Sequence, residues 1–346
     1  MLKCRTILVL LICSLLACLS YSRLPTTLDY QKEKTLQTTP DVTKWDVERD
    51  LVNNIEILSL FPSSNTIDIK GAVLLFHGCN RNGMDWFEYP EEQIIVNHLL
   101  SLSLAAIAIS SPDRTGSRCW NGKSDLKKVS TALNQYFETK LPIMQSNKQQ
   151  DQHENTETWQ TKSHLPLYAI GASSGGYFIP LLHNEIPLDG MICQISASPL
   201  FRTMEYFPPT VLIHMVHDSH ANEKTISSII KEVHNKPENQ NKITSYACHP
   251  KAITSESLKG RVPTLSITDA EEIKELLPLD EHGFLVSNPR SIWSSIVKKK
   301  PTTRLDKTTQ LSLQEELNVA FAQHEITSDF VEEAMDFISL KNSAEL

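Results

Sequence analysis

A short glycine-rich turn places the strongest constraint on the fold of this 346-residue chain. The pentapeptide GASSG at positions 171–175 follows an apolar run over residues 165–170 and opens a segment with helical character. The pattern G-x-S-x-G between a strand and a helix is typical of a sharp turn at the carboxyl edge of a parallel sheet. Glycine supplies the backbone freedom for such a turn, and the serine then stands at the positive end of the following helix. The turn therefore predicts an α/β architecture that presents Ser173.

The rest of the chain predicts the same architecture. Short, nearly continuous apolar runs alternate with segments of helical spacing, as in a parallel sheet that is buried on both faces. The expected strands cover residues 54–62, 71–78, 104–110, 165–170, 190–196, 210–216 and 243–248. The expected helices cover residues 89–102, 124–141, 225–234 and 328–340. This alternation predicts one α/β domain, with a mostly parallel central sheet and helices on both faces.

The N-terminal residues 1–22 have the layout of a secretory signal peptide. Two basic residues precede an apolar run over residues 6–19, and small residues follow it. The run is shorter than the roughly 20 residues that span a bilayer. An uncleaved membrane anchor and a lipoprotein signal around residues 15–18 are the alternative interpretations. We therefore expect a protein that is secreted or lies within the secretory pathway.

Behind the signal, we expect a polar arm over residues 23–50 and the α/β domain over 51–346. A polar, glutamine-rich tract at 145–163 predicts a surface loop. Residues 250–310 break the alternation of strands and helices before the C-terminal helix. We expect this insertion to form a small cap over or beside the active site, with Leu276 and Leu277 shaping an acyl pocket.

Charge and cysteine content narrow the functional classes. Without residues 1–22 the chain has 31 basic and 41 acidic residues, which excludes a basic surface for nucleic acid or anionic membrane. Four cysteines remain in the mature chain, and in an exported protein they predict up to two disulfides. They are Cys79, Cys119, Cys193 and Cys248. No Cys-x-x-Cys pair indicates zinc.

The turn at 171–175 predicts Ser173 as a nucleophile, with Ser174 as the weaker alternative. A serine nucleophile needs two hydrogen-bond donors for the oxyanion that forms during acyl transfer. The usual donors are the residue after the nucleophile and a residue after an earlier strand. Here they would be the backbone N–H groups of Ser174 and Cys79, because His77-Gly78-Cys79 ends the strand over residues 71–78.

The acid and the base would follow the serine in the order Ser, acid, His. Asp218 lies just after the strand at 210–216, and Asp113 is the alternative acid. Three histidines compete for the role of base. His324 immediately precedes the terminal helix, His249 follows the last strand, and His282 lies within the insertion. Because a packed helix would hold the base within reach of the serine, we expect His324 to serve as the base.

With these residues in view, the chain resembles the α/β-hydrolase superfamily over about residues 54–340. The segments HGC at 77–79 and RCWN at 118–121 resemble elements of the feruloyl esterase and polyester-depolymerase group. The whole chain is also similar to uncharacterised plant and algal α/β-hydrolase-like proteins, which have similar HGC, RCW and terminal His-Glu segments.

The resemblance implies a carboxylic ester hydrolase that acts on a small-molecule or polymeric ester. It implies no metal or organic cofactor, no nucleic-acid partner and no membrane association after signal removal. A peptidase or thioesterase with the same triad, and a catalytically silent binding protein, are the alternatives. In this fold Cys79 and Cys119 would follow neighbouring strands, which predicts a disulfide between them, with two free thiols as the alternative.

Overall fold

A computed structural model describes residues 45–62, 68–144, 165–204 and 206–343. The expected signal peptide, most of the expected arm over 23–50 and the expected loop at 145–163 lie outside these described residues. Within the described ranges, none of the helices is both long and apolar enough to span a membrane.

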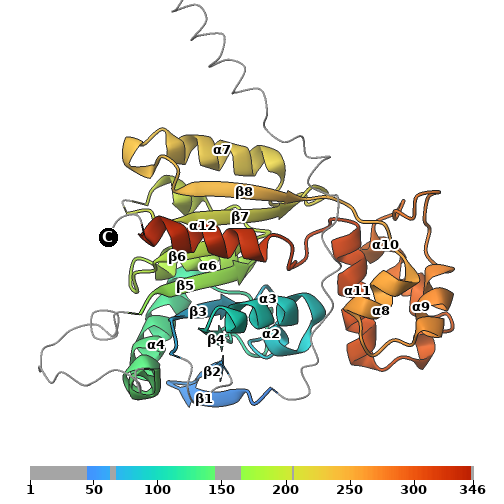
Figure 1. Cartoon of the computed structure of the whole chain (residues 1–346), viewed down its shortest axis with the longest axis horizontal. Coiled ribbons are helices and arrows are strands. Elements are labelled where there is room, and N and C mark those ends of the chain that lie inside the picture. The colour runs from blue at the N-terminus through green and yellow to red at the C-terminus, as the bar shows by residue number, and fades with distance from the viewer. Residues whose placement is uncertain (1–44, 63–67, 145–164, 205, 344–346) are drawn as a thin grey trace, which may run out of the picture. The chain divides into compact units, whose positions relative to one another are not determined.

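Eight strands form one sheet in the order β1-β2-β4-β3-β5-β6-β7-β8 (Figure 1). β2 pairs antiparallel with both β1 and β4, and all the other neighbours are parallel. The strands are β1 (Glu48–Val52), β2 (Ile55–Leu60), β3 (Gly71–Phe76), β4 (Leu104–Ile109), β5 (Leu167–Ala172), β6 (Gly190–Gln194), β7 (Thr210–Met215) and β8 (Ile243–Cys248). The predicted mostly parallel sheet is confirmed.

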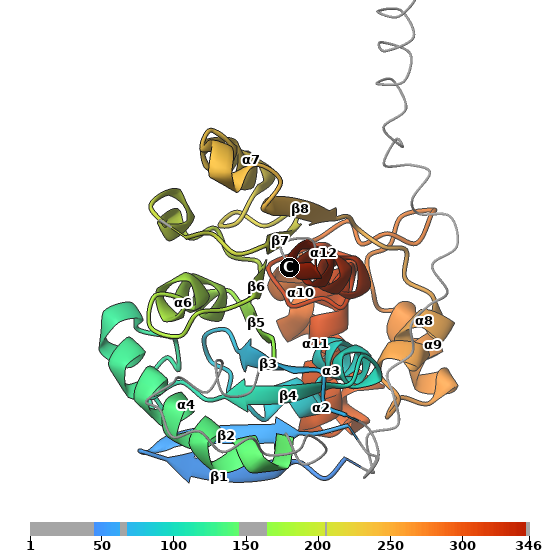
Figure 2. The same ribbon diagram turned by 60° about the vertical axis from the view of Figure 1, so that its left-hand side comes forward.

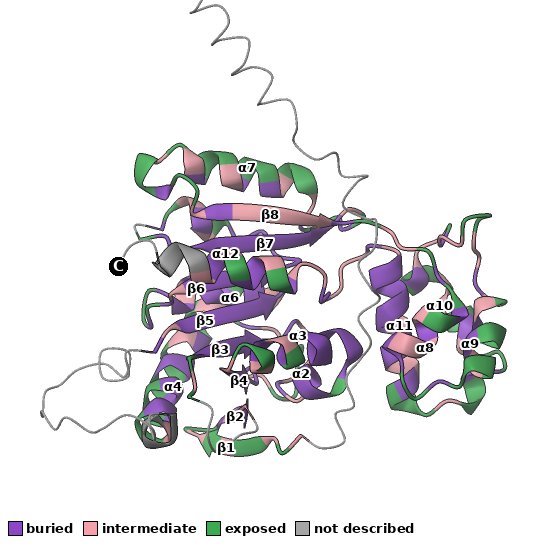
Figure 3. Ribbon diagram, in the orientation of Figure 1, coloured by how far each residue is buried: buried purple, intermediate pink, exposed green. Residues whose placement is uncertain are grey.

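β1 is the one strand here that the sequence did not predict, and its first three residues belong to the expected arm over 23–50. The strand lies at the edge of the sheet and is largely exposed, so it lacks the apolar run that marks a buried strand. In contrast, β3, β4 and β5 are buried along their whole length (Figure 3).

Helices cover both faces of the sheet (Figure 2). One face is covered by α2 (Asp85–Glu88), α3 (Pro90–Ser101) and α12 (Val331–Ser343). The other is covered by α4 (Gly122–Met144), α6 (Ser174–Leu182) and α7 (Glu223–His234). Apolar side chains alternate between the two faces along the central strands, so each face has its own core. This three-layer arrangement holds the carboxyl ends of β3, β5 and β7 together at one edge.

Four further helices form a small cluster between β8 and α12: α8 (Ser255–Arg261), α9 (Ile267–Lys274), α10 (Pro289–Ile296) and α11 (Lys307–Ala320). Figure 1 shows them beyond the end toward which β7 and β8 point. Leu258, Ile273 and Leu313 belong to a separate core that these helices share. We refer to α8–α11 as the inserted helices. They continue to Ala320, past the expected boundary at 310, because α11 packs into the same core.

Buried charged side chains join the inserted helices to α3. Arg261 of α8 forms a 2.5 Å ion pair with Glu91 of α3 and lies 3.5 Å from Glu316 of α11. Burial raises the pKa of Glu316 to about 8, although the Arg261 guanidinium lowers it. Partial compensation by one guanidinium allows two carboxyl groups to be buried together at this contact.

Candidate active site

Ser173 occupies the turn between β5 and α6, with φ 51° and ψ −115°. Such a positive φ costs a non-glycine residue about 1–3 kcal/mol, so the surrounding structure must hold it in place. The backbone N–H of Ser173 donates to the carbonyl of Gln194 in β6. On the other side, α6 begins so close to β3 that a Cβ on Gly175 would lie 2.5 Å from the Phe76 carbonyl oxygen. Glycine at 175 therefore permits the turn.

Ser173, His324 and Asp218 form one chain of hydrogen bonds. The Nε2 atom of His324 lies 3.0 Å from Ser173 Oγ, and its Nδ1 atom lies 2.6 Å from Asp218 Oδ2. Burial raises the pKa of Asp218, but the hydrogen bonds from His324 and the His220 backbone N–H lower it below its usual value overall. Asp218 is therefore a buried, ionised carboxylate that accepts a hydrogen bond from Nδ1–H, which leaves Nε2 free to accept the serine proton.

The loop that carries His324 is held from several sides. The backbone N–H of Thr327 donates to Gln194 Oε1 at 2.9 Å, and the backbone N–H of Ser328 donates to Glu91 Oε2. Arg290 of α10 donates to the carbonyl of His324. The imidazole is thus anchored through its backbone by the sheet, by α3 and by the inserted helices.

Among the described residues, the side chains of the other candidates form no hydrogen bond with Ser173 or His324. Ser174 Oγ accepts a 3.4 Å hydrogen bond from the Trp120 backbone N–H. His249 is exposed, as is His282, which lies 3.5 Å from its neighbour Glu281. Asp113 caps its own turn by accepting backbone N–H bonds at 2.7 Å and 3.0 Å.

The loop after β3 passes beside the serine. A Cβ on Gly78 would lie 3.5 Å from Ser173 Cβ. Cys79 forms a disulfide with Cys119, so the loop is tied covalently to the segment that follows β4. Within the described part of the chain, the backbone N–H groups of Cys79 and Ser174 donate to no other protein group. Both remain available as hydrogen-bond donors next to Ser173.

His77 is 1% exposed and forms hydrogen bonds through both ring nitrogens. The backbone N–H of Ser111 donates to Nε2 at 3.0 Å, so Nδ1 carries the proton and donates to the Gly78 carbonyl at 2.6 Å. Burial lowers the pKa of His77 to about 4, which keeps the ring neutral near pH 7. The sequence predicted that the segment His77-Gly78-Cys79 carries an oxyanion donor but gave the His77 side chain no role, and this buried histidine holds the loop that carries Cys79.

A cavity of about 360 Å³ opens beside Ser173 and His324. Its walls come from the loop after β3, from the turn after β5, from the residue after β6, from α10 and α11, and from the His324 loop. The lining residues are Gly78, Cys79, Asn80, Arg81, Ala172, Ser173, Ile195, Arg290, Leu311, Gln314, Glu315, Asn318, His324, Glu325 and Ile326. This size lies at the lower end of the range for small-molecule sites.

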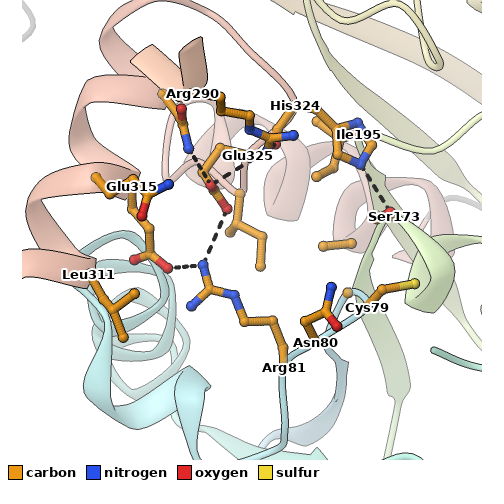
Figure 4. A pocket seen from close by; sticks show the side chains of 15 residues that line it. Cys79, Asn80, Arg81, Ser173, Ile195, Arg290, Leu311, Glu315, His324 and Glu325 are labelled. Atoms are coloured by element: carbon orange, nitrogen blue, oxygen red, sulfur yellow. Dashed lines mark hydrogen bonds and ion pairs between the residues drawn. The ribbon is translucent and has the colours of Figure 1, made fainter. Parts of the chain in front are cut away.

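Charged side chains group on the wall opposite Ser173 (Figure 4). Arg81 forms an ion pair with Glu315, and its guanidinium lies 3.6 Å from Glu325. Arg290 lies 3.9 Å from the same Glu325, whose Oε2 also accepts a 3.0 Å hydrogen bond from Asn318. Burial raises the pKa of Glu315, and the nearby carboxylates add to the effect. The two guanidinium and two carboxyl groups therefore pair mainly with each other.

The sheet order and the order of these residues along the chain decide the fold. The serine turn follows β5, the acid follows β7, and the histidine follows β8, all at the carboxyl edge of a mostly parallel sheet. This is the α/β-hydrolase fold. The predicted fold class is therefore confirmed.

No family model matches the chain, and no curated protein matches its sequence. Solved structures of this fold resemble parts of it at low identity. A predicted CIB-like hydrolase from Thermoplasma acidophilum is 14% identical, with a TM-score of 0.40 over 59% of this chain and 86% of that one. An α/β serine hydrolase without lid from Xanthomonas campestris is 10% identical, with a TM-score of 0.39 over 59% and 84%. Est1E from Butyrivibrio proteoclasticus, solved with ferulic acid, is 11% identical, with a TM-score of 0.39 over 58% and 90%.

The inserted helices line the cavity through α10 and α11, and not through Leu276 and Leu277 as we expected. Leu277 is buried in the core that the inserted helices share, so replacing it would affect their folding. Sequence reasoning also missed Arg81, Arg290 and Glu315. Arg81 lies two residues after Cys79, which is a weak local signal, whereas nothing in the sequence around α10 or α11 marks a pocket.

Proposed function

We propose that this protein is a serine hydrolase that cleaves carboxylic esters with Ser173 as its nucleophile. The observation that supports the proposal is the chain of hydrogen bonds from Ser173 through His324 to the buried Asp218. A serine hydroxyl is a weak nucleophile at neutral pH, and an adjacent, oriented histidine is the arrangement that activates it.

In the first half of the reaction, Ser173 Oγ attacks the acyl carbon while His324 Nε2 takes its proton. Asp218 holds the imidazole through Nδ1 and stabilises the imidazolium that forms. The negative charge moves to the former carbonyl oxygen, where the backbone N–H groups of Cys79 and Ser174 would stabilise it. Removing one such donor in other enzymes lowers kcat by about 10²–10³-fold.

In the second half, the tetrahedral intermediate collapses and His324 gives its proton to the departing alcohol oxygen. The acyl group is then bonded to Ser173 Oγ. Water attacks this acyl-enzyme, His324 takes the water proton, and the acid is released with Ser173 restored. One ester and one water thus yield one acid and one alcohol.

We also propose that the protein is exported. The signal-like layout of residues 1–22 and the disulfide between Cys79 and Cys119 support this, because disulfides persist in oxidising compartments. Expression in a secreting eukaryotic host, followed by intact mass measurement of the medium fraction, tests it. Loss of residues 1–22 is expected, and retention of the protein inside the cell would contradict export.

A fluorophosphonate probe tests the chemistry directly, because it labels an activated serine. We expect mass mapping to place the label on Ser173, Ser173→Ala to abolish it, and Ser174→Ala to retain it. His324→Ala should lower kcat for 4-nitrophenyl acetate by 10³-fold or more, since triad members act as a unit. His249→Ala and His282→Ala are the matched controls and should retain turnover.

The same assay separates the alternatives. We compare kcat/KM for a matched acetate ester, thioester and anilide. The highest value for the ester, the thioester or the anilide indicates an esterase, a thioesterase or a peptidase, respectively. Labelling of Ser173 without turnover of any of the three would indicate a binding protein with a preserved triad. Absence of labelling in the folded protein would refute the proposed nucleophile.

A further inference from the structure

Among the described residues, several that line the cavity beside Ser173 carry a polar group without a protein partner. Asn318 Oδ1 and Glu315 Oε2 are buried and accept no hydrogen bond from the described part of the chain. The side-chain amides of Asn80 and Gln314 line the same cavity, and within the described ranges they too have no protein partner. The Asn80 and Gln314 amides come from two separate segments, the loop after β3 and helix α11, so they reach the cavity from different sides. Asn318 Oδ1 and Glu315 Oε2 each expose less than 1 Å², so these two atoms lie behind the lining.

The charged groups of the cavity are already matched to each other. Arg81 and Arg290 face Glu315 and Glu325, with separations of up to 3.9 Å between the paired groups. An anionic ligand would have to displace a carboxylate from the guanidinium group that it pairs with. A cationic ligand would have to displace a guanidinium group from its carboxylate. The cavity therefore favours a neutral ligand group that forms hydrogen bonds.

An alkyl or aryl group would displace water from the Asn80 and Gln314 amides without pairing them. Each buried polar group that loses its water without gaining a partner costs about 1–3 kcal/mol. Sites built from such groups reject analogues that lack the matching hydroxyls far more strongly than apolar pockets reject extra methylenes. Hydroxyl groups both donate and accept, so they suit amides, a carboxyl and guanidinium groups together. Ile195, Leu311 and Ile326 offer apolar surface for the C–H faces of such a group.

We infer that the cavity binds a compact, neutral, polyhydroxylated group, so that the substrate is an ester of a polyol or of a polyhydroxylated acid. This inference rests on the proposed ester hydrolysis for its reaction, and on the cavity alone for its binding. Gln314 is the residue whose substitution tests it most cleanly, because its amide lines the cavity and has no structural hydrogen bond in the described part of the chain.

Two matched pairs of esters test the inference and show which side of the ester enters the cavity. Glucose 6-acetate and cyclohexylmethyl acetate differ in the hydroxylation of the alcohol. Methyl 3,4,5-trihydroxycyclohexanecarboxylate and methyl cyclohexanecarboxylate differ in that of the acid. We expect kcat/KM to be at least tenfold higher for the hydroxylated member of one pair. Equal values within both pairs, or a preference for the members without hydroxyl groups, would overturn the inference.

Gln314→Leu keeps the size of the side chain and should reduce the discrimination within the preferred pair by about fivefold or more. Thr308→Val, an exposed and nearly isosteric change on the same helix, is the matched control and should leave it unchanged. Calorimetric binding of the same esters to Ser173→Ala repeats the comparison without turnover. Tighter binding of hydroxylated esters by a protein that hydrolyses none would refute ester hydrolysis and support the cavity assignment. Equal binding of both members of each pair would refute the assignment itself.

Discussion

The Nδ1–H group of His77 donates a 2.6 Å hydrogen bond to the backbone carbonyl of Gly78. That carbonyl belongs to the same peptide unit as the N–H of Cys79, and in a planar trans peptide the two groups point in opposite directions. Fixing the Gly78 carbonyl therefore fixes the direction of the Cys79 N–H. His77 is in turn held by the Ser111 backbone, so it acts as a positioning residue for an oxyanion donor.

His77→Phe should lower kcat for esters by about 10²-fold with KM changed by less than about threefold, because the oxyanion forms only in the transition state. His77→Asn retains one donor that can reach the Gly78 carbonyl and should restore part of kcat. Steady-state kinetics with circular dichroism as the folding control gives the answer. An equal rise in KM for both variants with kcat unchanged would show that His77 does not act through the oxyanion donors.

The disulfide between Cys79 and Cys119 closes a separation of 40 residues, and it joins the oxyanion loop to the segment after β4. In the chain-entropy treatment, closing a loop of this length stabilises the folded state by about 3–4 kcal/mol. The double variant Cys79→Ser/Cys119→Ser should lose about that much free energy of unfolding. Its kcat should fall by a larger factor than its affinity for the substrate. Denaturant titration checks it. Dithiothreitol should lower the free energy of unfolding of the wild type toward that of the variant and leave the variant unchanged, since Cys193 and Cys248 form no disulfide.

The fold was predictable because its central strands are continuous apolar runs and its turn has a distinct sequence. β3, β4 and β5 are buried on both faces, and strands in this position must be apolar along their whole length. β1 escaped prediction because an exposed edge strand is under no such constraint. Prediction of α11 failed because its buried charged residues, Glu315 and Glu316, obscure the apolar face that packs on the inserted helices.

The site was predictable only where chemistry restricts the choice of residue. Ser173 stands in a recognisable turn, and chain order pointed to Asp218 and His324 as its partners. In the structure, His324 lies 3.0 Å from Ser173 Oγ and 2.6 Å from Asp218 Oδ2. The lining of the cavity depends on how the inserted helices dock. Arg290 and Asn318 reach it from residues that are distant from the serine turn in sequence, so no local pattern could have indicated them.

The close approach of α6 to β3 makes a prediction about Gly175. A Cβ at this position would lie 2.5 Å from the Phe76 carbonyl oxygen and 2.6 Å from that of His77, and backbone atoms cannot easily move away. Gly175→Ala should therefore destabilise the protein by about 1–3 kcal/mol and displace Ser173. Gly78→Ala is the control, because its Cβ would make only an ordinary 3.5 Å contact with Ser173 Cβ. Thermal unfolding should separate the two variants, and equal melting temperatures would contradict the steric argument.

The last prediction concerns Glu92, which is 2% exposed on α3. Burial raises its pKa from 4.5 to about 8, although the Arg81 guanidinium opposes the shift. Between these two pH values the folded state binds the proton and the unfolded state does not, so raising the pH through this window lowers the free energy of unfolding. Below pH 4.5 the carboxyl is protonated in both states, and the contribution is constant.

Glu92→Gln removes this titration while it keeps the shape of the side chain. The free energy of unfolding of the variant minus that of the wild type should therefore rise with pH between about 4.5 and 8, by at most about 1.4 kcal/mol per pH unit. Urea titrations at several pH values measure the difference directly. Glu138→Gln changes an exposed carboxylate on α4 and is the matched control. A flat difference for Glu92→Gln would show that Glu92 is ionised in the folded protein throughout this range. An equal rise for Glu138→Gln would show that the pH dependence does not come from the burial of Glu92.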